Sequence, residues 1–225
     1  MKKLLAAIIA AALLLSGCSL SSRPAVSAPP AETPSPSPTP IVTPTPAPEP
    51  SDDELVLVRD YIPGIFIDLK YATTDNFTGR VIYDSDEAYL RYGTVKKLLC
   101  AQNELSGRGL SLKIWDAYRP VSAQFKLWEI CPNPVYVSDP NNGYSKHSRA
   151  NTVDITLVTD TGKSISMPSG FDDFTSLADR DYSDVSAEAA ENARLLENVM
   201  VENGFVPYSG EWWHYSDSVA YDVYG

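Results

Sequence analysis

A proline-rich stretch near the N-terminus limits the part of this chain that can build a hydrophobic core. Eleven of the 18 prolines lie between Pro24 and Pro50, mixed with serine, threonine and alanine. Repeated Thr-Pro and Ser-Pro units offer too few apolar side chains for a core and favour an extended polyproline II spacer. We therefore expect one folded domain over residues 53–225, which is long enough to bury a core without cross-links.

The segment before this spacer is typical of an exported lipoprotein. Two lysines precede an apolar run at 4–15, which is too short to span a bilayer and has the character of a signal peptide. The run ends in Leu-Ser-Gly-Cys18, similar to the processing site of bacterial lipoproteins. We expect a signal peptide at 1–17, a lipid-carrying Cys18 with a linker to residue 52, and a domain held outside the cytoplasm at the membrane. A plain secretory signal without lipid is the alternative.

The domain is acidic, and its charge excludes some partners. Residues 53–225 contain 26 acidic and 15 basic side chains, a net charge of −11. Such a balance argues against binding to nucleic acid and against electrostatic binding to anionic lipids. Besides Cys18, the chain has Cys100 and Cys131. An exported pair can form a disulfide, but Cys100 in an apolar helical pattern is also consistent with a buried thiol, and spacing does not decide between them.

The hydrophobic patterns predict an α+β fold, with helices packed on a small antiparallel sheet. Alternating or β-branched runs favour strands, and apolar residues at three- and four-residue spacing favour helices. We expect strands at 55–58, 65–71, 110–114, 151–158, 205–208 and 211–215, and helices at 94–105, from Ser122 to 130 and from Ser186 to 203.

The only two histidines, His147 and His214, lie in surroundings that favour a metal site. An isolated histidine is more often structural. However, Asp154 follows His147 by seven residues, in a strand whose apolar residues alternate with it, so the carboxylate faces away from the core. Two neutral imidazoles and one carboxylate make three zinc ligands, and catalytic zinc keeps the fourth position open for water. We therefore expect a single zinc site on the sheet.

Glu211 precedes His214 by three residues and is the candidate general base. Residues three apart on a regular strand point to opposite faces. A bulge or a strand end near Trp212 is therefore needed to bring both side chains into one site.

Five motifs follow one another along nearly the whole domain. They are Lys-Tyr-Ala-Thr-Thr-Asp-Asn-Phe-Thr-Gly at 70–79, Trp-Asp-Ala-Tyr-Arg-Pro at 115–120, Ser-Lys-His-Ser-Arg at 145–149 with Asp154, Phe171-Asp172, and Glu-Trp-Trp-His-Tyr at 211–215. In this order they resemble the VanX-type D-Ala-D-Ala dipeptidases of the zinc D,D-peptidase superfamily. The resemblance implies hydrolysis of D-Ala-D-Ala or a related D,D-dipeptide, with one Zn²⁺ per chain.

The resemblance also assigns roles to individual residues. It implies that His147, Asp154 and His214 bind zinc, that Glu211 is the base, and that Arg119 stabilises the tetrahedral intermediate. A guanidinium suits that task because it stays charged and offers two donors to an oxyanion. The resemblance further implies that Asp172 binds the free ammonium of the dipeptide and that Tyr71 and Ser145 contact the substrate.

Without the resemblance, two of these residues have simpler interpretations. Arg119 would be a surface arginine before a turn proline. Asp172 would be a helix N-cap, a role that Asp173 can equally fill.

The chain departs from the family pattern at three points. Lys146 stands where the resistance enzymes carry a small serine, and Ala150 stands where glycine is usual. Neither change removes a ligand, but Lys146 leaves the exact dipeptide open. The lipoprotein signal is the third departure, because a resistance dipeptidase must destroy D-Ala-D-Ala in the cytosol. An exported enzyme fits better with dipeptides or peptides derived from the cell wall or the environment.

Two other functions remain as alternatives. A peptidoglycan D,D-carboxypeptidase or endopeptidase shares the zinc ligands, and tethering at the cell surface favours it. A catalytically dead wall-binding lipoprotein is the non-enzymatic alternative, and it predicts the loss of a ligand or of the base. No such residue is lost in this sequence.

Overall fold

The computed structural model describes residues 48–225. Cys18, the signal peptide and most of the linker lie outside the described residues. Within 48–225, no helix combines the length and apolar character needed to cross a membrane.

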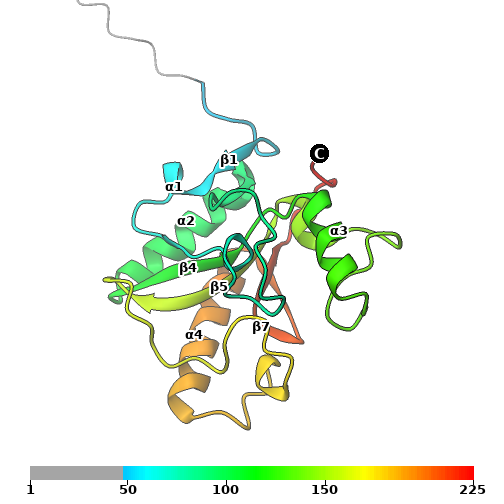
Figure 1. The fold of residues 1–225 in the computed structure, drawn as a ribbon. Coiled ribbons are helices and arrows are strands. Elements are labelled where there is room, and N and C mark those ends of the chain that lie inside the picture. Colours follow the sequence, from blue (N-terminus) through cyan, green and yellow to red (C-terminus); the bar gives the residue numbers. More distant parts are fainter. Residues whose placement is uncertain (1–47) are drawn as a thin grey trace, which may run out of the picture. The chain divides into compact units, whose positions relative to one another are not determined.

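A five-stranded sheet lies at the centre of the domain (Figure 1). Its strand order is β2-β4-β5-β7-β6, and β2 pairs in parallel with β4 while every other pair is antiparallel. A second, two-stranded antiparallel sheet joins β1 and β3. The bounds are β1 Leu55–Leu57, β2 Phe66–Ile67, β3 Tyr89–Arg91, β4 Leu110–Asp116, β5 Thr152–Thr159, β6 Phe205–Tyr208 and β7 Glu211–Asp217.

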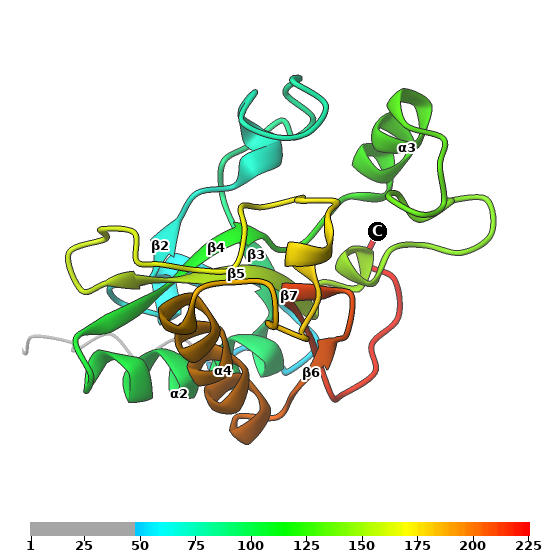
Figure 2. The ribbon, with the colours of Figure 1, turned by 90° about the horizontal axis from the view of Figure 1, so that it is seen from below.

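Two long helices cover one face of the large sheet, and Figure 2 shows them side by side below it. They are α2, Tyr92–Ser106, and α4, Ala187–Glu202. Both bury residues at helical spacing against the sheet, including Leu98 and Leu105 in α2 and Leu196 and Met200 in α4. The expected α+β architecture is therefore confirmed, with one parallel pair at the edge of an otherwise antiparallel sheet.

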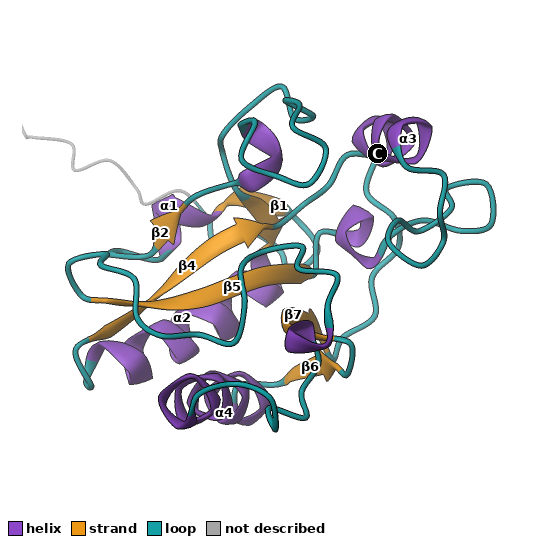
Figure 3. Ribbon diagram, turned by 60° about the horizontal axis from the view of Figure 1, so that its bottom comes forward, coloured by secondary structure: helices purple, strands orange, loops and turns teal. Residues whose placement is uncertain are grey.

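The opposite face of the sheet is covered by long connections rather than by helices (Figure 3). One connection leads from β2 to β3 and contains the 3₁₀ helix η1, Lys70–Ala72. The other leads from β5 to α4 and contains η3, Ser176–Ala178. Strand β5 is consequently buried on both faces up to its last residue. The alternating pattern of β5 predicted which side chains point to each face of the sheet. However, the face that carries Asp154 is covered by these connections and is not open to solvent.

Three short helices complete the domain. They are α1, Val58–Tyr61, α3, Val121–Ile130, and the 3₁₀ helix η2, Lys146–Arg149. Helix α3 lies beyond one end of the sheet (Figure 1). Element η2 immediately precedes β5 and brings its residues to the end of that strand.

Several expected boundaries were wrong. The first strand ends at Leu57, because the chain turns into α1 at Val58. The expected strand 65–71 is reduced to β2, because Lys70 pairs with both Asp68 and Asp75 and holds a turn there. Helix α3 begins at Val121 after Pro120, so Ser122 is not its cap, whereas the hydroxyl of Ser186 caps α4 by accepting the N–H of Ala189.

The two remaining cysteines are both free. Cys131 is partly buried at the end of α3, and Cys100 is exposed. The interpretation of Cys100 as a buried thiol was therefore wrong: it lies on the face of α2 that points away from the sheet.

The strands are irregular close to the predicted site. Along β6 and β7, Pro207 pairs with Tyr215, but the next residue, Tyr208, pairs with Glu211. Three residues of β7, Trp212–His214, therefore have no opposite residue on β6. This is the expected bulge near Trp212, and it lets Glu211 and His214 turn towards the same side.

Candidate metal centre and active site

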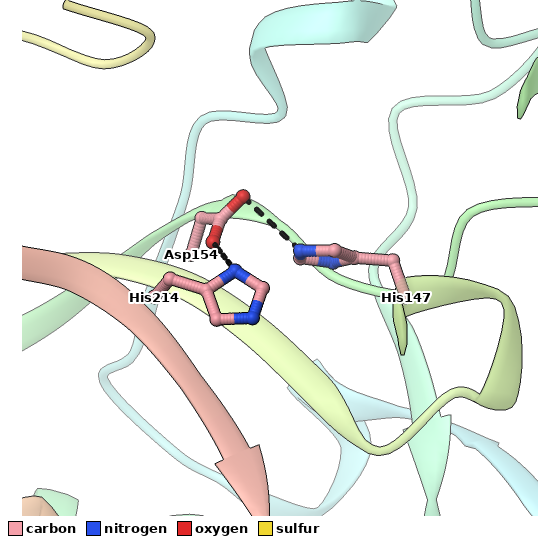
Figure 4. Close-up of side chains that lie close together, drawn as sticks. All are labelled: His147, Asp154 and His214. Atoms are coloured by element: carbon pink, nitrogen blue, oxygen red, sulfur yellow. Dashed lines mark hydrogen bonds and ion pairs between the residues drawn. The ribbon is translucent and has the colours of Figure 1, made fainter. Parts of the chain in front are cut away.

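The two histidines and Asp154 meet at the end of the sheet (Figure 4). Asp154 of β5 lies directly opposite His214 of β7, and His147 reaches them from η2. One carboxylate oxygen of Asp154 is 3.0 Å from Nδ1 of His214, and the other is 3.3 Å from Nε2 of His147. Among residues 48–225, this is the one group of at least three potential ligands whose donor atoms lie within 4.8 Å of one another.

Hydrogen bonds select the nitrogen atom that His147 offers to this centre. Its Nδ1 lies 2.9 Å from the carbonyl oxygen of Ala117 and must donate a proton to it. The lone pair then resides on Nε2, the nitrogen that faces Asp154. Holding an imidazole by its second nitrogen is a common way to orient a metal ligand.

The donor set fits zinc in both chemistry and spacing. Imidazole nitrogens and a carboxylate oxygen are ligands that zinc accepts, and bonds of about 2.0–2.2 Å in a tetrahedron place ligand atoms roughly 3.4 Å apart. The two separations in this structure are 3.0 and 3.3 Å. Three ligands leave the fourth position of a catalytic site open.

The surroundings of the three residues shift their pKa values. Burial would raise the pKa of Asp154, but the two facing imidazoles outweigh it and hold that pKa well below its ordinary value. Burial lowers the pKa of His214, which favours the neutral form that binds a metal. Asp154 is therefore ionised, and its carboxylate faces one ring nitrogen of each histidine.

Local structure positions the turn that carries His147. The hydroxyl of Ser145 caps η2 by accepting the backbone N–H of His147 at 3.3 Å. Ala150 ends the turn with φ of 58°, in the left-handed region that favours glycine. This backbone conformation gives a physical reason for the glycine that is usual at that position. Ser145 thus has a structural partner, and its contact with substrate stays a prediction.

Glu211 lies beside the candidate ligands. Its carboxylate is 3.4 Å from Nδ1 of His214 and is partly exposed, with 35% of the side chain accessible. Burial, together with the charges of Asp154 and Asp172, raises the pKa of Glu211 to about 8. A carboxyl group with such a pKa exchanges protons readily near neutral pH.

Arg119 is buried and held by a network that the sequence analysis did not identify. One terminal nitrogen donates to Asp116 at 2.6 Å, and the other donates to Gln124 at 2.9 Å. Asp116 is fully buried and also accepts the hydroxyl of Tyr83. The backbone N–H of Arg119 donates to the carbonyl of His147 at 3.2 Å, which joins the arginine to the metal centre. Arg119 is therefore not a surface residue.

The missed residue Asp116 carried a signal in the sequence. It stands three positions before Arg119 in the same motif, at the end of a strand, and a carboxylate at that spacing can pair with a guanidinium. Tyr83 and Gln124 gave no comparable signal, because tertiary folding alone brings them to Arg119.

Asp172 and Tyr71 lie together at the side of the site. The Tyr71 hydroxyl donates to Asp172 at 2.8 Å, and the Tyr71 ring stacks under the guanidinium of Arg119. Asp172 has φ of 52°, a strained conformation for a residue other than glycine. Burial is the main cause that raises its pKa to about 7. Asp173, by contrast, accepts two hydrogen bonds from Thr175 in a turn.

Neither aspartate is a helix N-cap, because Thr175 caps η3 and Ser186 caps α4. Asp173 fills the structural role of a turn residue, and Asp172 turns its carboxylate towards Tyr71. Asp172 also lines a groove of about 420 Å³ together with Trp115 and Phe171. The structure thus brings together every predicted site residue within 48–225.

Comparison with known proteins gives consistent matches. Residues 51–222 match the protein family described as D-ala-D-ala dipeptidase. The D-alanyl-D-alanine dipeptidase of Escherichia coli K12 is 39% identical over 162 residues, covering 72% of this chain and 83% of that protein. The enzyme of the same name from Enterococcus faecium is 34% identical over 176 residues, covering 69% of this chain and 87% of that protein.

Solved structures show a weaker likeness. VanYB in complex with D-Alanine-D-Alanine is 17% identical, with a TM-score of 0.41, over 60% of this chain and 75% of that chain. A VanY D,D-pentapeptidase from a VanB-type resistance cassette, in complex with Zn(II), gives 17% identity and a TM-score of 0.40.

Proposed function

Because this chain belongs to the D-Ala-D-Ala dipeptidase family of zinc peptidases, we propose that it hydrolyses D-Ala-D-Ala or closely related D,D-dipeptides. The observation that carries the proposal is the convergence of His147, Asp154 and His214, with donor atoms within 4.8 Å of one another and Glu211 beside them. These are the parts that hydrolysis of an amide by an activated water requires.

The geometry supports the ligand roles. Nε2 of His147, the carboxylate of Asp154 and Nδ1 of His214 would hold one zinc ion. Zinc at this place supplies Lewis-acid chemistry, polarising the scissile carbonyl and lowering the pKa of the attacking water.

Glu211 acts as the general base and then as the general acid. Its ionised carboxylate takes a proton from the attacking water and passes that proton to the nitrogen of the leaving D-amino acid. Its place next to His214 puts it within reach of both partners.

Arg119 stabilises the oxyanion that forms when water attacks the carbonyl carbon. Asp116 and Gln124 each take one N–H from its terminal nitrogens, which leaves one N–H on each nitrogen for the oxyanion. Because these partners fix the guanidinium before substrate arrives, no reorganisation is needed in the transition state.

Asp172 sets the length of the substrate by pairing with its free ammonium. The carboxylate is partly buried, and within residues 48–225 Tyr71 is its one hydrogen-bond donor, so a positive charge would complete its partners. An N-acylated peptide has no ammonium and would leave this carboxylate unpaired, which is costly in a partly buried site. We therefore expect free dipeptides to be preferred over longer peptides.

The decisive experiment compares kcat/KM of the zinc-loaded protein for three substrates. They are D-Ala-D-Ala, its N-acetyl form and a stem pentapeptide that ends in D-Ala-D-Ala. The free dipeptide should be hydrolysed at least 10²-fold faster than the other two, as roughly 3 kcal/mol for an unpaired carboxylate implies. Equal rates for pentapeptide and dipeptide would replace the dipeptidase with a D,D-carboxypeptidase.

We also propose that the enzyme is anchored outside the cytoplasm by lipid on Cys18. The support is the sequence alone: an apolar run that ends in Leu-Ser-Gly-Cys, followed by a proline-rich spacer. Its substrates would then be dipeptides or peptides released from the cell wall. Cys18→Ala should shift the protein from the membrane fraction to the soluble fraction. Membrane retention of that variant after signal cleavage would refute the anchor.

A further inference from the structure

Arg180 joins β6 to β7, the strand that carries both Glu211 and His214, although neither the motifs nor the mechanism includes it. The residue lies in the loop between η3 and α4, and only 10% of its side chain is exposed. Its guanidinium donates to the carbonyl of Tyr208 at 2.7 Å and to the carbonyl of His214 at 3.1 Å. Its own backbone N–H donates to the carbonyl of Ser209 at 3.3 Å.

The hairpin needs such a donor because its own ladder is interrupted there. Pro207 lies opposite Tyr215 but has no N–H to donate. On β7, the three residues before Tyr215, Trp212–His214, have no opposite residue on β6. Arg180 thus supplies N–H groups to carbonyls of both strands at the place where backbone pairing fails.

Two further partners fix the orientation of this guanidinium. One terminal nitrogen donates to Glu197 of α4 at 2.9 Å and to the hydroxyl of Tyr215 at 3.1 Å. The ring of Tyr215 also lies under the guanidinium, 4.6 Å from it. A planar fork with five donors can satisfy these acceptors at once, which the single ammonium of lysine cannot.

The bulge held in this way is a requirement of the active site. On a regular strand, Glu211 and His214 would point to opposite faces of the sheet. The bulge turns both to one side, with 3.4 Å between the carboxylate and Nδ1. A residue that stabilises the bulge therefore acts on the metal ligand and on the base together.

We propose that Arg180 is a positioning residue of the active site, whose contacts with the carbonyls of Tyr208 and His214 hold Glu211 and His214 in catalytic geometry. This inference rests on the proposed function for its kinetic consequences but not for its effect on zinc binding. Arg180 acts through the hairpin and touches no reacting atom.

The test compares Arg180→Ala with the wild-type full-length protein. Loss of an outer partner of a metal ligand typically costs about 10- to 100-fold in metal affinity or activity. We expect the zinc Kd, measured by competition with a chromogenic chelator, to rise by such a factor. At saturating zinc, kcat for D-Ala-D-Ala should fall about 10-fold or more. KM should change little, because Tyr71 continues to hold Asp172.

Arg194→Ala is the matched control. Arg194 is an exposed arginine of α4 that stacks on Tyr182, in the same neighbourhood, and within residues 48–225 it forms no hydrogen bond or ion pair with the hairpin. It should keep the wild-type zinc Kd and kcat. Glu197→Gln removes the charge of the ion pair but keeps an acceptor for Arg180, and it should also stay close to wild type.

Arg180→Lys provides a second variant if the alanine protein does not fold. Lysine keeps the charge but not the fork, so its zinc Kd and kcat should lie between those of wild type and Arg180→Ala. Wild-type values in Arg180→Lys would refute the need for a guanidinium with several donors. Wild-type zinc affinity in Arg180→Ala would refute the positioning role. If Glu197→Gln reproduced the full loss, the ion pair rather than the carbonyl contacts would carry the effect.

The zinc measurement separates this inference from the proposed function. A wild-type protein that hydrolyses no D,D-dipeptide would refute the function. Weaker zinc binding in Arg180→Ala would still support the positioning role in that case.

Discussion

Replacement of Glu211 should remove most of the turnover without removing the metal. Glu211→Gln keeps the shape of the side chain and all three metal ligands, while it removes the group that moves the proton. Zinc content should stay at one per chain, and kcat should fall by roughly 10²- to 10⁴-fold. Glu202→Gln, at the exposed end of α4, should leave kcat unchanged. Near-normal turnover by Glu211→Gln would place the base elsewhere.

Arg119 should affect the rate without affecting the metal. Arg119→Ala removes donors to the oxyanion, and we expect kcat to fall by about 10²- to 10³-fold with zinc still bound. Arg119→Lys should be almost as slow, because an ammonium cannot contact Asp116, Gln124 and the oxyanion together. Zinc analysis beside steady-state kinetics tests both variants. A wild-type kcat in Arg119→Lys would show that Arg119 acts through its positive charge alone.

Asp172 should make stability depend on pH in an unusual direction. Burial raises its pKa to about 7 in the folded protein, whereas an unfolded aspartate has a pKa of about 3.9. The folded state therefore binds more protons, and its stability falls as pH rises between these two values, by at most roughly 1.4 kcal/mol per pH unit. Asp172→Asn keeps an acceptor for Tyr71 and removes this cost.

Urea unfolding of the zinc-free proteins at two pH values tests this expectation. Asp172→Asn should be more stable than wild type at pH 8 and of similar stability at pH 4. It should also lose much of its affinity for the free dipeptide, because the partner of the ammonium is neutral. Equal stability of the two proteins at pH 8 would show that the carboxylate ionises without penalty.

At the scale of elements, hydrophobic periodicity predicted the long elements and the short strands β1 and β6, but it missed other short ones. Helices α2 and α4 and strands β4, β5 and β7 have clear patterns over seven residues or more, and their expected positions agree with the structure. Strand β3 has three residues and the helix α1 four, which is too short for a period to emerge. The single parallel pair follows from tertiary packing of β2 against β4, which no local pattern encodes.

The site was more predictable than the fold, because its ligands occur in recognisable motifs. The spacing of Glu211 and His214 required a bulge or a strand end near Trp212, and the structure contains a bulge there. The supporting contacts were not predictable. Arg180 lies about thirty residues before the hairpin that it holds, and Ala117 fixes His147 through a backbone carbonyl, for which side-chain identity gives no signal.

Two serine caps allow a test of how one element serves the site. Ser145 caps η2 and Ser186 caps α4, each through a hydrogen bond to a backbone N–H. Replacing either with alanine should lower the free energy of unfolding by about 1 kcal/mol. Only Ser145→Ala should also weaken zinc binding, because η2 carries His147 and α4 carries no ligand. Calorimetry and zinc titration of both variants decide this. If Ser145→Ala bound zinc as tightly as Ser186→Ala, Ser145 would have no role at the metal and would act only in substrate binding or in stability.

For the molecule as a whole, the metal centre joins parts that are distant in the sequence. His147, Asp154 and His214 come from a turn, a central strand and the C-terminal hairpin. In the absence of a cation, burial and the charge of the neighbouring Asp154 raise the pKa values of Asp172 and Glu211, so these two carboxyl groups are costly to ionise. A divalent cation at this place should therefore stabilise the entire domain.

Chelation should consequently lower the thermal stability of the protein. A ligand that binds only the folded state at 100 times its Kd adds about 2.7 kcal/mol to the free energy of unfolding. For a domain of this size, that amount shifts Tm by roughly 5–10 °C. Wild-type protein with zinc should thus melt that much higher than the same protein with excess chelator. His214→Ala should melt at the same temperature under both conditions, because it lacks a ligand. A zinc-dependent rise in Tm of His214→Ala equal to that of wild type would mean that the stabilising cation binds elsewhere.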